Sequence, residues 1–78
     1  MKAYLARDED GVLYLYYSPP LKNRMKGMWI DKDMPILKVE ELFFDESYFA
    51  SVKWEDDEPT EVEYWPNVED DMQYIKLK

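Results

Sequence analysis

The 78-residue sequence contains no cysteine and no histidine. Without cysteine the chain can form no disulfide, thiolate metal site or thiol nucleophile. Without histidine it also lacks the commonest acid–base group and transition-metal ligand. No stretch approaches the roughly twenty consecutive apolar residues of a membrane span, and the sequence from Met1 meets an acid at Asp8, too early for a signal peptide. These absences exclude much of enzyme chemistry and predict a soluble, cytoplasmic protein that does not engage membranes.

Aromatic residues, by contrast, make up 17% of the chain. A chain this short has room for a single small domain, residues 1–78, and buries only about 60% of the surface that its unfolded form exposes. Each aromatic ring buries a large area, so rings are one way to build a core without disulfides or a metal. Pairing with a second copy, as a homodimer, is another. We expect one folded domain.

The net charge of −8 is unevenly placed along the chain. Residues 1–39 hold seven basic and five acidic residues, whereas residues 40–78 hold three basic and thirteen acidic ones. Such a chain repels nucleic acid and anionic membranes at long range and attracts basic surfaces. We therefore expect no nucleic-acid ligand, and the simplest role of the acidity is to keep a small domain in solution.

Two β-type runs flank an Asp-Gly turn near the N-terminus. Residues 2–7 and 12–17 surround Asp8–Gly11, in which glycine supplies the positive φ of a tight hairpin turn. In the second run, side chains alternate and both faces are largely apolar or aromatic. This pattern predicts a hairpin whose second strand is covered on both sides.

The middle of the chain gives weaker signals. Pro19 and Pro20 end the second strand, and residues 21–27 have no sustained period, so we interpret them as a loop. Residues 28–30 predict a short strand. Residues 36–44 fit a helical stripe almost as well as strand alternation, and we favour a strand because Val, Ile and Phe prefer it.

The acidic second half predicts one short helical turn and two further strands. Asp45 is a good cap for a turn over residues 45–52. Residues 60–65 alternate as a half-exposed strand, and residues 72–78 form a plausible last strand whose lysines discourage edge pairing. We expect a mainly β fold, a small antiparallel meander of about five or six strands. Its predicted core is Leu5, Leu13, Leu15, Ile30, Val39, Phe43, Val52, Val62, Tyr64 and Ile75.

No arrangement of residues predicts catalysis. The many carboxylates sit in hydrophilic runs, whereas a catalytic pair needs one buried member with a raised pKa. Asp8 and Asp10 resemble the start of a calcium loop, but the later ligands and the closing glutamate are missing. We therefore expect no enzymatic activity, no cofactor and no specific metal site.

Two charged segments suggest binding instead. Lys22, Arg24 and Lys26 precede Trp29, and this basic segment could lie against the acidic second half, within one fold or across a dimer. A row of acidic residues could imitate a phosphate backbone. Its last two members alternate along a predicted strand, where alternate residues lie about 7 Å apart. The row comprises Glu55, Asp56, Asp57, Glu58, Glu61 and Glu63.

Two segments resemble a known group of proteins. Residues 6–16 and 49–63 are similar to the patterns ARDxDGxLYLY and VKWEDxEPxEVE of short uncharacterised proteins from gut Bacteroides-type bacteria and their mobile elements. The match covers about a third of the chain and departs from the pattern at residues 50–51 and beyond Glu63. The resemblance implies a mobile-element origin and carries over no activity or site residues.

The sequence therefore predicts a small acidic binding or accessory module that contacts an unknown protein partner. The alternative is a mobile-element inhibitor that acts as an acidic nucleic-acid mimic. An aromatic interface tolerates salt, whereas a mimic loses its partners steeply as salt rises. The candidate partner-binding residues are Tyr14, Tyr16 and Trp29 together with the acidic row.

Overall fold

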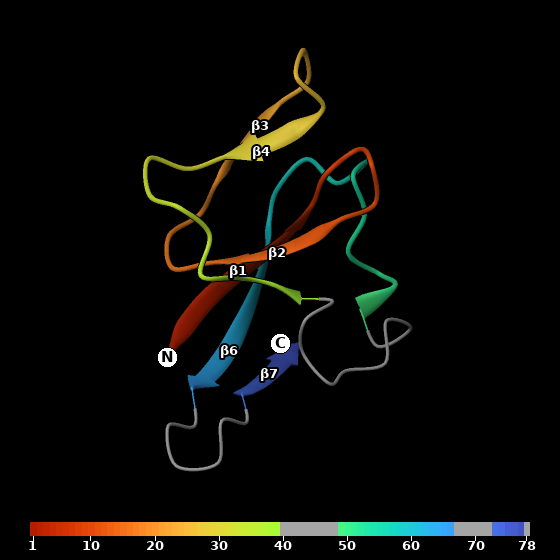
Figure 1. Cartoon of the computed structure of the whole chain (residues 1–78). Coiled ribbons are helices and arrows are strands. Elements are labelled where there is room, and N and C mark those ends of the chain that lie inside the picture. The colour runs from red at the N-terminus through yellow and green to blue at the C-terminus, as the bar shows by residue number, and fades with distance from the viewer. Residues whose placement is uncertain (40–48, 67–72, 78) are drawn as a thin grey trace.

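The structure is a computed structural model that describes residues 1–39, 49–66 and 73–77. Within these ranges the chain is mainly β, as predicted, and its strands form two antiparallel sheets (Figure 1). No helix among the described residues is long and apolar enough to cross a membrane. The strands are β1 (Lys2–Arg7), β2 (Leu13–Tyr16), β3 (Leu21–Asn23), β4 (Met28–Ile30), β5 (Leu37–Lys38), β6 (Thr60–Pro66) and β7 (Gln73–Leu77).

The larger sheet has the strand order β5-β2-β1-β6-β7, with β1 at its centre. β1 and β2 form the predicted hairpin, in which Leu5 pairs with Leu15. The turn closes through two main-chain bonds: the Asp8 N–H donates to the Val12 carbonyl at 2.9 Å, and the Gly11 N–H donates to the Asp8 carbonyl at 2.9 Å. Gly11 has a φ of 92°, which is why this turn needs glycine. On its other side, β1 pairs with β6, far away in sequence.

The smaller sheet is the β3–β4 hairpin, and the predicted loop over residues 21–27 is therefore wrong for its first three residues. Leu21 pairs with Ile30 and Lys22 with Trp29. The tight connection is supported by the Asn23 side chain, whose Oδ1 accepts a bond from the Lys26 N–H at 3.0 Å, and by Gly27 at a φ of 68°. The sequence of β3 shows no apolar alternation, since Leu21 is its one apolar residue, and the side chain of Leu21 is exposed.

Two hydrophobic clusters lie on opposite faces of the β1–β2 hairpin. β2 is covered on both sides, as its sequence predicts: its odd-numbered residues enter one cluster and its even-numbered residues the other. The sheet cluster comprises Ala3, Leu5, Leu13, Leu15, Val39, Phe49, Val52, Val62, Tyr64 and Ile75. The hairpin cluster comprises Ala6, Tyr16 and Trp29, with Tyr14 and Trp54 packed against it.

Eight of the ten predicted core residues are buried in the sheet cluster. Ile30 is a correction, since 39% of it is exposed. Within the three-residue strand β4, alternation can point only one of the large side chains inward, and that place goes to Trp29. The remaining predicted core residue, Phe43, lies outside the described residues.

The segment before the second acidic run is only partly described. A strand is confirmed at Leu37–Lys38, and residues 40–44 lie outside the described residues. Of the predicted helical turn over residues 45–52, the described part is a turn in which the Val52 N–H donates to the Phe49 carbonyl at 3.0 Å. That turn places Phe49 and Val52 in the sheet cluster.

Candidate partner-binding site

The β3–β4 hairpin is fixed to the main sheet by Trp29. The Trp29 indole Nε1–H donates to the Arg7 carbonyl at 3.0 Å, and its main-chain N–H donates to the Asp8 carboxylate at 2.9 Å. The Glu9 N–H also donates to the Gly27 carbonyl at 3.0 Å. These bonds join the hairpin to the end of β1, so the position of the hairpin is set by directional contacts as well as by burial.

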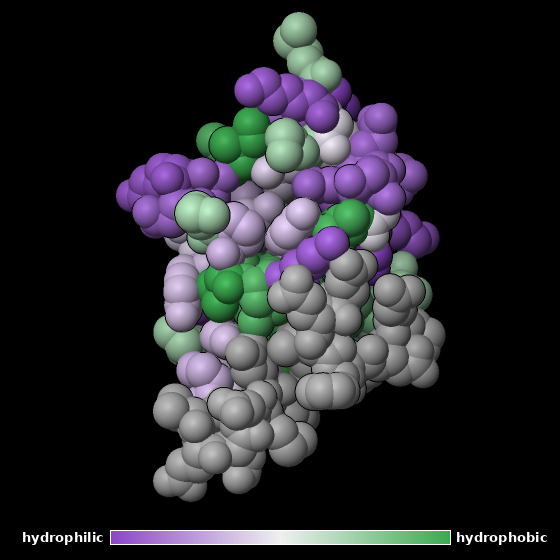
Figure 2. Space-filling model, viewed as in Figure 1, coloured by the Kyte–Doolittle hydropathy of each residue, from purple (hydrophilic) through white to green (hydrophobic). Residues whose placement is uncertain are grey.

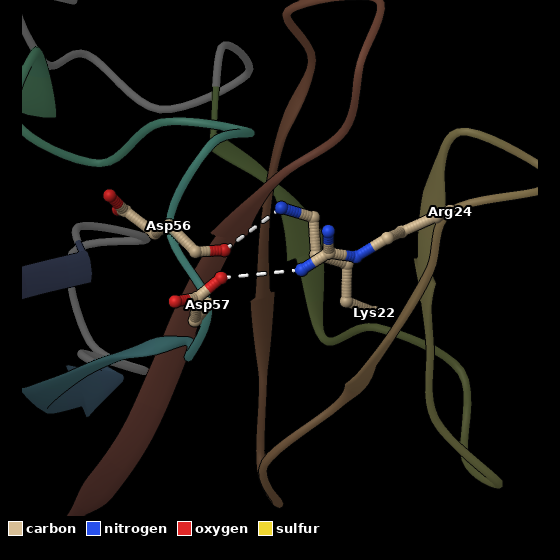
Figure 3. Close-up of polar contacts among 4 residues, drawn as sticks. All are labelled: Lys22, Arg24, Asp56 and Asp57. Carbon is tan, nitrogen blue, oxygen red and sulfur yellow. Dashed lines mark hydrogen bonds and ion pairs between the residues drawn. The ribbon is translucent and has the colours of Figure 1, made fainter.

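Lys22 joins the hairpin to the acidic segment over residues 55–58. Its ammonium lies 4.4 Å from the ring centre of Trp54 and 5.8 Å from that of Trp29. The two indoles meet edge to face, with their ring centres 6.4 Å apart. The same ammonium donates to the Asp56 carbonyl at 3.1 Å (Figure 3). Aromatic faces attract a cation in this range, by about 0.5–2 kcal/mol.

Arg24 adds an ion pair to this contact. Its guanidinium lies 3.3 Å from the Asp57 carboxylate, and Figure 3 shows it pointing toward the acidic segment beside Lys22. Because both side chains are largely exposed, the pair contributes little to stability. The basic segment therefore meets the acidic segment within one chain, which is one of the two arrangements that the charge asymmetry predicts.

Arg7 holds the segment over residues 49–52 against the hairpin turn. Its Nε donates to the Val52 carbonyl at 2.7 Å, and its two terminal nitrogens donate to the carbonyls of Gly11 at 2.8 Å and Phe49 at 3.2 Å. A planar guanidinium suits this task because its donors lie in a fixed fork. The arginine therefore has a structural role, because it ties the segment over residues 49–52 to the first hairpin.

The outer face of the β3–β4 hairpin is apolar and exposed. In the Leu21–Ile30 pair, 77% of Leu21 is exposed, and at the hairpin tip Met25 is 99% exposed. Figure 2 shows hydrophobic side chains lying among hydrophilic ones over this hairpin. The exposed apolar side chains of this segment, called the hairpin face below, are Leu21, Met25, Met28, Ile30 and Met34.

A hollow of about 340 Å³ lies between β2, β4 and the segment over residues 31–35. Aromatic and apolar side chains dominate its walls, and three carboxylates and one lysine complete them. We call it the aromatic hollow. Its lining residues are Asp8, Tyr14, Tyr16, Met28, Trp29, Ile30, Asp31, Lys32, Asp33, Met34 and Pro35.

The polar groups of the aromatic hollow are held in place. The Asp31 carboxylate accepts bonds from the Ser18 hydroxyl at 2.7 Å and from the Lys32 N–H at 2.8 Å. Burial raises the pKa of Asp8, although the bond from the Trp29 N–H opposes the shift. Burial also raises the pKa of Tyr16, and the nearby Asp8 carboxylate adds to that rise. With three carboxylates and one lysine, the lining of the hollow carries an excess of acidic groups.

The structure brings together three of the predicted partner-binding residues, because Tyr14, Tyr16 and Trp29 all line the aromatic hollow. Trp29 is only 4% exposed and Tyr16 is similarly buried, while Tyr14 is half-buried. The two buried rings thus form part of the inner wall of the hollow, not a free surface. Sequence reasoning missed the carboxylates and the two methionines that share this site.

The acidic row lies outside the aromatic hollow and has partners within the chain. Lys2 lies 3.2 Å from Glu61, and the Met1 ammonium lies 3.6 Å from Glu63. The Asp56 carboxylate accepts the Lys53 N–H at 3.0 Å. Asp57 is paired to Arg24, whereas Glu55 and Glu58 are exposed to solvent.

Comparisons with protein-family models, curated proteins and solved structures found no match to this chain. Among the residues that the structure describes, no three acidic side chains are placed to hold a metal ion. The lining of the aromatic hollow offers apolar contacts, aromatic rings and carboxylates.

Proposed function

We propose that this protein is a small binding module that contacts another protein through the hairpin face. The observation that carries the proposal is the concentration of exposed apolar side chains there. Of the eight large hydrophobic residues that the described chain exposes, five belong to the segment over residues 21–34. Single exposed apolar residues are ordinary, whereas a group of them on one element marks an interaction surface.

The composition of the hairpin face suits a protein partner. Methionine side chains are flexible and polarisable, and both methionine and aromatic residues are enriched at protein interfaces. Residues 21–34 themselves carry four basic and two acidic side chains, whereas three carboxylates and one lysine line the neighbouring hollow. Charge complementarity at the hollow therefore favours a partner that brings a cationic side chain beside its apolar contacts.

Site-specific cross-linking tests this proposal. A photoreactive benzophenone amino acid in place of Met25, which is almost fully exposed, should cross-link to one defined partner protein in cells. The exposed variant Leu21→Ser should abolish that product without unfolding the domain. Benzophenone in place of Tyr17, another exposed residue, provides the matched control and should not give the product.

Three results would count against this function. Identical products from both benzophenone positions would show that the hairpin face has no special role. A product that survives Leu21→Ser would point to another surface. A product with twice the mass of the chain would identify the occupant as a second copy of this protein and overturn the proposal of a different partner protein.

Nucleic-acid mimicry remains the alternative function, but it has less support. The acidic row supplies the negative charge that a mimic needs, yet Asp57, Glu61 and Glu63 each have a cationic neighbour in the same chain. Neutralising all six members of the row separates the two functions. A cross-linked partner that is retained after this change would argue against mimicry through the row.

A further inference from the structure

The aromatic hollow has the size and walls of a site for one long side chain. Its volume, about 340 Å³, lies at the lower end of the roughly 300–1,000 Å³ that small-molecule sites span. The ring centres of Tyr14 and Tyr16 lie 6.4 Å apart, and the planes of the two rings are inclined by 54° to each other. Trp29 adds a third aromatic wall.

The charges around the hollow favour a cation. Asp8, Asp31 and Asp33 line it, against Lys32 alone, which is exposed. This excess is local, because the described residues as a whole contain eleven acidic and nine basic side chains. Since the described carboxylates do not converge as metal ligands do, the walls suit a larger, organic cation. The electron-rich face of tyrosine binds such cations, and Tyr14 is the half-buried ring that offers one, with Tyr16 and Trp29 buried in the wall behind it.

We infer that the aromatic hollow receives the cationic side chain, a lysine or an arginine, of the protein that docks on the hairpin face. This inference rests on the proposed function, because Met28 and Ile30 belong to both the hairpin face and the hollow. The apolar stem of the cationic side chain contacts Met34 and Pro35 while its charged end lies between the rings and the carboxylates. A cation with a long apolar stem matches such a mixed lining.

Short peptides test the hollow directly. Acetyl-Gly-Lys-Gly-amide and acetyl-Gly-Arg-Gly-amide should shift the amide NMR signals of Tyr14, Asp33 and Met34, whereas acetyl-Gly-Gln-Gly-amide should bind roughly tenfold more weakly. The comparison of the lysine and arginine peptides also identifies the preferred cation. Equal binding of the glutamine peptide, or shifts confined to residues 55–58, would overturn the inference.

Variants with matched controls locate the binding. Tyr14→Leu removes a ring face, and Asp33→Asn removes an exposed charge, so each should weaken the lysine or arginine peptide several-fold. Lys32→Ala removes the one cation of the lining and should strengthen binding. Tyr17→Leu and Glu58→Gln make the same chemical changes outside the hollow and should leave binding unchanged. Because Asp33 is exposed, its variant remains informative even if Tyr14→Leu fails to fold.

The two proposals can fail separately. Leu21 and Met25, which test the hairpin face, do not line the aromatic hollow. Cross-linking that depends on Leu21 without selective peptide binding would retain the binding function and overturn the cation site. Selective peptide binding without a cross-linked partner would support the cation site and overturn docking through the hairpin face.

Discussion

The two faces of β2 are covered in different ways. One face contributes Leu13 and Leu15 to the sheet cluster, which is mostly aliphatic and draws on both the β1–β2 and β6–β7 hairpins. The other face contributes Tyr14 and Tyr16 to the hairpin cluster, which is small and aromatic. Trp29, a member of this cluster, also donates a hydrogen bond from its main-chain N–H to the Asp8 carboxylate. The sheet cluster depends on the area that it buries, whereas the hairpin cluster also depends on the geometry of individual contacts.

In the function proposed above, stability and recognition rest on different clusters of side chains. The sheet cluster lies on the opposite face of the β1–β2 hairpin from the hairpin cluster. The hairpin cluster, in contrast, forms the wall of the aromatic hollow and is braced by the ammonium of Lys22. A partner that binds the hollow therefore acts on the cluster that is sensitive to charge.

The largest effect should come from the sheet cluster. Leu15→Ala removes a fully buried side chain beside the central strand and should lower the free energy of unfolding by about 2–5 kcal/mol. Urea denaturation followed by tryptophan fluorescence and by circular dichroism should show both signals shifting together. A loss below about 1 kcal/mol would mean that the cluster repacks around the cavity.

Breaking the contacts of Arg7 should have the next largest effect. Arg7→Lys keeps the charge but can no longer reach three carbonyls, and it should cost about 2 kcal/mol of unfolding free energy. Arg24→Lys is the matched control, because its exposed ion pair should be worth less than about 1 kcal/mol. Equal effects of the two variants in urea denaturation would contradict the structural role of Arg7.

Removing the charge of Lys22 should weaken the docking of the β3–β4 hairpin and leave the main sheet intact. Lys22→Met keeps an apolar stem and loses the cation over Trp54, so it should weaken hairpin docking by about 1 kcal/mol. Hydrogen exchange should quicken at the amide of Trp29, while the amide of Leu5 keeps its protection. Lys26→Met changes an exposed lysine of the same hairpin and serves as the control.

The smallest effect concerns the pH dependence of the hairpin cluster. Because the pKa of Asp8 is raised in the folded state, its contribution to stability is full below its unfolded pKa, near 3.8, and declines as pH rises through the folded value. Asp8→Asn keeps an oxygen acceptor for the Trp29 N–H without the buried charge. It should be slightly more stable than the parent at pH 7.

This gain should shrink as the pH falls through the raised folded pKa of Asp8 and should be lost below 3.8, where the parent carboxyl is protonated in both states. Thermal melts of both proteins at pH 7 and pH 3 provide the comparison. A variant that is less stable at both pH values would show that the amide cannot replace the carboxylate as acceptor.

The features that sequence predicts well here are local ones. The first hairpin follows from Asp-Gly between alternating runs, and β6 follows from the clean alternation in residues 60–65. The burial of Leu13 on one face and Tyr16 on the other follows from the two-residue period of a strand. Each of these depends on neighbours in the chain.

The features that sequence could not predict depend on distant contacts. Nothing in residues 21–23 signals a strand, yet β3 pairs with β4, and Lys22 and Trp29 of this hairpin contact Trp54, which lies at least 25 residues away in sequence. The aromatic hollow combines Tyr14 with residues of the segment over 31–35 through the fold alone. Its acidic members were therefore not distinguishable from other exposed acids.

The acceptors of Arg7 in the segment over residues 49–52 are main-chain carbonyls, which every amino acid provides. The identity of the exposed side chains at Ala50 and Ser51 is therefore immaterial to this contact. Substitutions at these two positions should leave the contact intact, whereas a substitution at Arg7 should remove it. The sequence requirement of this contact therefore rests on one side chain, and the segment that it holds can vary in sequence.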